Sequence, residues 1–165
     1  MIAGWLCLLL PLPSVLWRLL MLAGVDVGFA EAPLFRADRG LTLYVLALDA
    51  VEILVGIACL GLIRPWGEVA PRFAPVVGGR TIPRWLPLAI GGTGFALMLL
   101  IWAAMAAQFI PSWLGWTHGW TPDHSMDGPH RGFLLLCYIP FALWPAAIGV
   151  ALAGYWLRRR PVRAS

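Results

Sequence analysis

Between Leu41 and Ile63 the sequence reads LTLYVLALDAVEILVGIACLGLI, in which Asp49 and Glu52 are the charged residues. A helix that crosses a hydrocarbon core of about 30 Å needs about 20 predominantly apolar residues. This run has that length, and it lacks the alternation of apolar and polar residues that strands of a membrane barrel show. It predicts a transmembrane helix with two acidic side chains inside the membrane.

Three further apolar runs of similar length flank it, at about residues 2–24, 85–110 and 132–157. The first is interrupted by Pro11, Pro13 and Arg18, whereas the other two carry no charged residue. The chain is therefore predicted to be all-α, a four-helix bundle integral to the membrane, with residues 1–165 forming a single membrane domain.

The composition excludes an ordinary soluble domain. Hydrophobic residues make up 61 % of the 165 residues and charged residues 12 %, with a mean hydropathy of +0.81. Typical globular proteins have roughly 45–50 % apolar and about 25 % charged residues. The lipid bilayer is thus the predicted surrounding of most of the chain.

The positive charge is carried by arginine alone, and the formal net charge is +4. A basic chain could bind nucleic acid, but these arginines lie in short clusters beside the apolar runs. The positive-inside rule and contact with anionic phospholipids account better for that placement, so no nucleic-acid partner is predicted.

The arginines also predict the orientation. One side of a four-span topology holds eight of them, in the connection after the second run and in the C-terminal tail: Arg64, Arg72, Arg80, Arg84, Arg158, Arg159, Arg160 and Arg163. The opposite side holds three: Arg36, Arg39 and Arg131. Both termini are therefore predicted to be cytoplasmic, in a multi-pass protein of a bacterial plasma membrane. A cleaved signal peptide ending near Ala30 is the less favoured alternative, because the start of the chain lacks a positive charge.

Arg18, Asp49 and Glu52 form the first candidate site. Charged residues at mid-membrane are costly and generally pair inside the bundle. Asp49 and Glu52 are three residues apart and share one helix face, and the predicted spans place Arg18 at a depth of about 10–12 Å, like Asp49. The trio is either an ion-pair cluster that fixes the first two helices or a proton or cation site in which one carboxylate titrates.

The connection between the third and fourth runs is the second candidate site. It gathers five potential ligands of a borderline metal ion: His118, Asp123, His124, Asp127 and His130. Zinc is one interpretation, although this spacing fixes no ligand geometry. The alternative is a solvated loop whose tryptophans lie at headgroup level. No cofactor is otherwise predicted, and the absence of a C-x-x-C pair argues against thiol–disulfide exchange.

The connection after the second run is predicted to contact lipid headgroups. It is rich in proline and glycine, contains no phosphate-binding loop, and carries the residues expected to make that contact: Arg64, Trp66, Arg72, Arg80 and Arg84.

The segment from Gly61 to Pro83, with its R-P-W-G-E and G-G-R elements, resembles a connection in small, uncharacterised multi-spanning membrane proteins of actinobacteria. The residues Leu16-Trp-Arg-Leu19 are similar to that group as well. This resemblance implies four membrane helices and carries no catalytic residues.

Three classes of function remain open from the sequence. The favoured one is a non-enzymatic membrane component, such as an accessory subunit or a homo-oligomer. The others are a small transporter or ion-coupled carrier that uses the charged trio, and a metal-dependent membrane enzyme that uses the histidine-containing loop.

Overall fold

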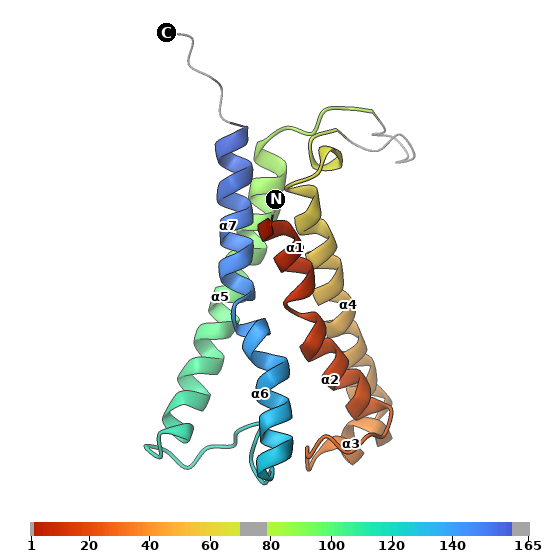
Figure 1. Ribbon diagram of the computed structural model, residues 1–165, viewed down its shortest axis with the longest axis vertical. Coiled ribbons are helices and arrows are strands. Elements are labelled where there is room, and N and C mark those ends of the chain that lie inside the picture. Colours follow the sequence, from red (N-terminus) through yellow and green to blue (C-terminus); the bar gives the residue numbers. More distant parts are fainter. Residues whose placement is uncertain (1, 70–78, 160–165) are drawn as a thin grey trace.

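The computed structural model describes residues 2–69 and 79–159, and its regular elements are helices (Figure 1). They are α1 (Ile2–Leu9), α2 (Leu12–Leu22), α3 (Ala32–Ala37), α4 (Arg39–Gly61), the 3₁₀ turn η1 (Pro65–Gly67), α5 (Trp85–Trp113), α6 (Gly128–Ala142) and α7 (Trp144–Arg158). Four helical segments are long and apolar enough to cross a membrane: Ile2–Leu22, Arg39–Gly61, Trp85–Trp113 and Gly128–Arg158. The prediction of an all-helical chain with four such segments is confirmed.

The first segment is two helices rather than one, and proline is the reason. Pro11 has no N–H, so the carbonyl of Cys7 loses the partner it would have in a continuous helix. The indole Nε1 of Trp144, on α7, donates to that carbonyl at 2.7 Å. A side chain from a distant helix thus satisfies the backbone group that the break between α1 and α2 sets free.

The fourth segment is also divided, between α6 and α7 at Leu143, after Pro140 and before Pro145. It begins at Gly128, earlier than predicted, because Asp127 acts as the N-cap. Its Oδ1 accepts a hydrogen bond of 3.0 Å from the backbone N–H of His130. Asp38 caps α4 in the same way, accepting from the N–H of Leu41 at 2.8 Å.

Helix α4 is the long straight element against which α1 and α2 pack (Figure 1). Its buried residues recur at helical spacing along one face: Val45, Asp49, Glu52, Gly56 and Cys59. Gly56 permits a very close approach of α1, since a Cβ there would lie 3.0 Å from the carbonyl oxygen of Cys7. The short helix α3, which the sequence did not predict, packs against α4 near the start of that helix.

Helix α5 lies at the periphery of the bundle and has no buried residue. It packs chiefly on α7, where the side chain of Leu152 lies against Gly91 and that of Phe95 against Gly149.

Figure 1 shows α1 beginning, and α7 ending, toward the same end of the bundle. Large apolar side chains face outward from the other helices too, including Leu54 and Leu136, which are 63 % and 70 % exposed. The exterior is therefore apolar along the length of the bundle.

Candidate functional site

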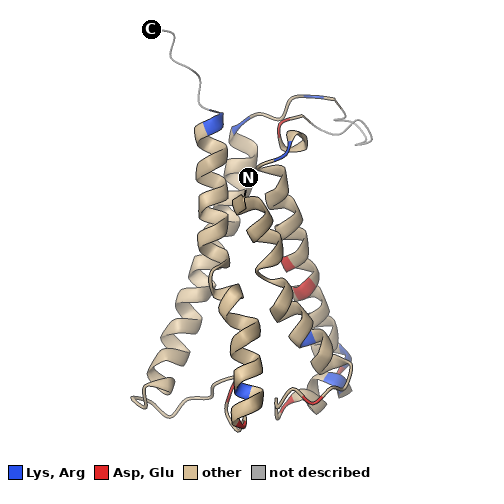
Figure 2. Cartoon of the chain, in the orientation of Figure 1, with Lys and Arg blue, Asp and Glu red and all other residues tan. Residues whose placement is uncertain are grey.

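Three charged side chains are buried between α2 and α4. Arg18 is 6 % exposed, and Asp49 and Glu52 are each 4 % exposed. Figure 2 shows the acidic residues of α4 part-way along that helix, away from both of its ends. Spacing on α4 explains why both carboxylates point the same way, because residues three apart lie on one helix face.

The guanidinium of Arg18 bridges the two carboxylates. Its Nε donates to Oδ1 of Asp49 at 2.5 Å, and its Nη2 donates to Oε2 of Glu52. The planar fork of an arginine suits this task, since it carries several N–H donors in fixed directions. The structure thus brings together the trio that the sequence singled out, and the bridge links α2 to α4.

A tyrosine from a third helix completes the cluster. The hydroxyl of Tyr138, on α6, lies 3.5 Å from Nη1 of Arg18. Its ring also packs edge-to-face on Trp17, with ring centroids 5.8 Å apart. Tyr138 therefore connects the charges to the neighbouring aromatic core, and α6 joins α2 and α4 around the site.

The cluster is not fully satisfied. Within the described part of the chain, Oδ2 of Asp49 is buried and accepts no hydrogen bond. One guanidinium and two ionised carboxylates also sum to −1. The arrangement can hold α2 and α4 together, and the buried Oδ2 of Asp49 remains able to accept a hydrogen bond or a proton.

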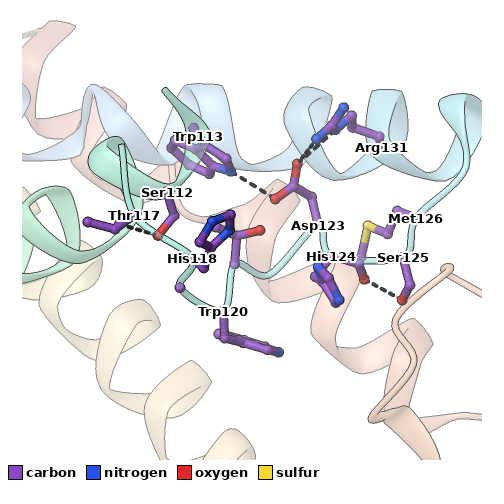
Figure 3. Close-up of a pocket in the computed structure, with 12 residues that line it drawn as sticks. Ser112, Trp113, Thr117, His118, Trp120, Asp123, His124, Ser125, Met126 and Arg131 are labelled. Carbon is purple, nitrogen blue, oxygen red and sulfur yellow. Dashed lines mark hydrogen bonds and ion pairs between the residues drawn. The ribbon is translucent and has the colours of Figure 1, made fainter. Parts of the chain in front are cut away.

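At the α3 end of the bundle, the connection between α5 and α6 surrounds an open pocket of about 680 Å³ (Figure 3). Asp123 is its most enclosed carboxylate, 8 % exposed. Trp113 Nε1 donates to Oδ1 of Asp123 at 2.8 Å, and Arg131 Nε donates to Oδ2 at 2.7 Å. Figure 3 shows Asp123 held between these two side chains.

These contacts govern the protonation of Asp123. Burial by itself would raise the pKa of this carboxyl, but the hydrogen bonds from Trp113 and Arg131 and the positive charge of Arg131 lower the pKa to about 2. At neutral pH, Asp123 is therefore an ionised partner of Arg131.

The five residues predicted as zinc ligands are divided among separate contacts. Asp123 is paired with Arg131, while Nδ1 of His130 lies 2.6 Å from Oδ1 of Asp127. His118 and His124 line the pocket of Figure 3. Among the residues that the structure describes, no group of three or more His, Cys, Asp or Glu side chains is placed to hold a metal ion. Among these described residues, the geometry assembles an Asp–Arg ion pair and a His–Asp hydrogen bond rather than a ligand set.

The Asp123–Arg131 pair predicts a pH dependence. Because the pKa of Asp123 in the folded state lies below its ordinary value of 3.8, the pair contributes stability at pH above about 4, and this contribution is lost as the pH falls toward 2. Thermal unfolding midpoints measured between pH 6 and pH 2 should fall less steeply for Asp123→Asn than for the parent chain. Equal slopes for the two proteins would contradict the assignment.

Four of the five residues predicted to contact lipid headgroups lie at the opposite end of the bundle. The guanidinium of Arg64 lies 5.6 Å from the ring centroid of Trp5, and Trp66 packs against Gly61. Arg80 and Arg84 are exposed, and Arg72 lies outside the described residues. Figure 2 shows basic residues at this end, where acidic residues are few.

Two further arginines at this end have a role that the sequence did not predict. Nη2 of Arg158 donates to the carbonyl of Leu62, just beyond α4, and Nη2 of Arg159 donates to that of Ile82 at 2.7 Å. These bonds hold the connection between α4 and α5 against the end of α7. The pattern of arginines indicated a cytoplasmic side but gave no signal for these backbone partners, nor for the part that Tyr138 plays in the charged cluster.

No family model, curated protein or solved structure matches this chain.

Proposed function

We propose that this chain is an integral membrane protein of four spans and a non-enzymatic component of a bacterial plasma membrane, acting as an accessory subunit or a homo-oligomer. The four long apolar helices and their apolar exterior support the membrane location. The greater number of arginines near the end of α7 supports a cytoplasmic location for both termini.

The observation that carries the non-enzymatic role is the bridge from Arg18 to Asp49 and Glu52. The buried charges hydrogen-bond to one another and join two helices, as expected of a cluster that fixes helix register in an apolar medium. The α5–α6 connection supports the same conclusion, since its buried carboxylate is engaged by Trp113 and Arg131.

Surface features support the proposed partners. Arg64, Trp66, Arg80 and Arg84 stand at one end of the bundle, where anionic phospholipid headgroups would meet them. Helix α5 presents a long unburied apolar surface to lipid, to a second copy or to a partner membrane subunit. The resemblance of the segment from Gly61 to Pro83 supports a place among the small membrane proteins of actinobacteria.

A second candidate, a small proton- or ion-coupled carrier, is favoured by the surplus negative charge of the cluster. A bridge between two helices requires only one acid, whereas this cluster contains two. Such a carrier would use Glu52 or Asp49 as the titrating group while Arg18 holds the other.

The experiment combines membrane extraction, topology and flux. The expressed chain should stay in the membrane pellet after alkaline carbonate extraction, and a reporter fused after Ser165 should be active only as a cytoplasmic fusion. Release by carbonate would overturn the membrane assignment. A reporter that is active outside the cell would overturn the orientation. Purified protein in liposomes should then show no proton flux above protein-free vesicles, whereas a flux that Glu52→Gln abolishes would favour the carrier.

A further inference from the structure

We propose that the Arg18–Asp49–Glu52 cluster is a proton-binding site that holds one proton at neutral pH, on Oδ2 of Asp49. The inference rests on the membrane location proposed above, and it assigns a ligand to the cluster whether the protein is a passive component or a carrier.

The charges of the cluster do not balance when both acids are ionised. Arg18 supplies one positive charge and contacts one oxygen of each carboxylate: Oδ1 of Asp49 and Oε2 of Glu52. Of the side chains that the structure describes, no second cation pairs with either acid. The remaining ionisable group at the cluster is the Tyr138 hydroxyl from α6, which supplies no positive charge. With both acids ionised, the cluster would carry −1.

The surroundings of the cluster disfavour a net charge. All three charged side chains are more than nine-tenths buried, and the buried residues beside Arg18 on α2 include the apolar side chains of Trp17 and Met21. An uncompensated ionised carboxylate in such a medium is far more costly than a neutral one. Binding one cation of unit charge brings the cluster to neutrality.

The oxygen atoms available in the cluster favour a proton as that cation. Metal cations that bind oxygen are surrounded by several oxygen ligands, typically six or more for the hard divalent ions. This cluster presents one buried carboxylate oxygen without a donor, Oδ2 of Asp49, while Arg18 already occupies one oxygen of each acid. A single unpartnered oxygen suits a proton, which forms one covalent O–H bond. Glu52 lies one turn further along the same face of α4 and is the second acid of the cluster.

Infrared spectroscopy of the purified protein in lipid nanodiscs tests the proposal directly. At pH 7 the parent chain should show a carbonyl stretch of a protonated carboxylic acid, equivalent to one carboxyl per chain, which shifts in D₂O. Asp49→Asn should lose this band. Asparagine keeps the shape of the side chain and leaves Arg18 neutralised by Glu52, so folding should be retained. Glu68→Gln, which changes a partly exposed acid near η1, is the matched control and should keep the band.

Each other outcome overturns the proposal. Absence of the band from the parent chain at pH 7 means that the cluster is fully ionised or holds another cation. A band that shifts when the side-chain carboxyl of glutamate, rather than that of aspartate, carries ¹³C places the proton on the wrong acid. If the Asp49 variant fails to fold, the parent chain with ¹³C-labelled aspartate still tests the proposal, because the band must be present and must shift. Because carbonate extraction tests the membrane location separately, failure of this inference is distinguishable from failure of the proposed function.

Discussion

Replacement of Arg18 by alanine is expected to abolish recovery of folded protein. The substitution leaves the carboxylates of Asp49 and Glu52 buried without the cation that compensates their negative charge. Removal of one partner of a buried ion pair costs about 3–5 kcal/mol, a large part of the roughly 5–15 kcal/mol that stabilises a typical protein. The measurement is the thermal unfolding midpoint, followed by tryptophan fluorescence, together with the yield of monodisperse protein in size-exclusion chromatography.

Arg80→Ala is the matched control, since Arg80 is exposed in the connection between α4 and α5. This variant should unfold like the parent chain. A triple variant that replaces Arg18, Asp49 and Glu52 by leucine should recover much of the lost stability, because a set of apolar side chains needs no counter-ion. An Arg18→Ala protein as stable as the parent would show that the bridge does not hold the bundle together.

Gly56→Leu is expected to separate α1 from α4. A Cβ at this position would lie 3.0 Å from both the carbonyl oxygen of Cys7 and the Cα of Leu8, so the contact is with backbone that cannot rotate away. Overpacking typically costs about 1–3 kcal/mol and occasionally more, and a leucine between two helix backbones belongs at the upper end of that range. A lowered unfolding midpoint should accompany loss of the hydrogen bond from Trp144 to Cys7, visible as a shift in tryptophan emission.

Gly92→Leu provides the comparison for this change. Gly92 is also a glycine within a long apolar helix, but a Cβ there meets no atom within 4 Å. Its substitution should leave the unfolding midpoint unchanged or slightly raised, because leucine favours the helix more than glycine does. Equal destabilisation by the two variants would mean that loss of glycine itself, rather than the α1–α4 contact, is responsible.

Much of the fold follows from local sequence. The four apolar runs gave the four long segments, because a length of about 20 apolar residues depends on composition alone. The spacing of Asp49 and Glu52 placed both on one face of α4, and Arg18 was recognised as their partner because charges in an apolar medium must pair. The ends and the continuity of the segments did not follow in the same way. The cap Asp127 starts the fourth segment several residues earlier than predicted, and Pro11 divides the first segment in two.

The candidate metal site shows where local reasoning stopped. His118, Asp123, His124, Asp127 and His130 lie close together in the sequence, yet their side chains divide among other contacts. Arg131, in the first turn of α6, pairs with Asp123, and the sequence did not predict this contact. Composition indicates which ligands a loop contains, but only the path of the backbone determines which of them converge.

By itself, the sequence determined the helical class, the number and approximate positions of the four segments, and the presence of buried charges that required a partner. These properties depend on residue type and periodicity, which are local. The tertiary structure alone decided that one guanidinium serves both acids, that Tyr138 joins them from α6, and that Trp144 satisfies the carbonyl set free by Pro11. Those contacts join residues more than 30 positions apart, and their geometry is set by how the helices pack against one another rather than by the residues beside them in the chain.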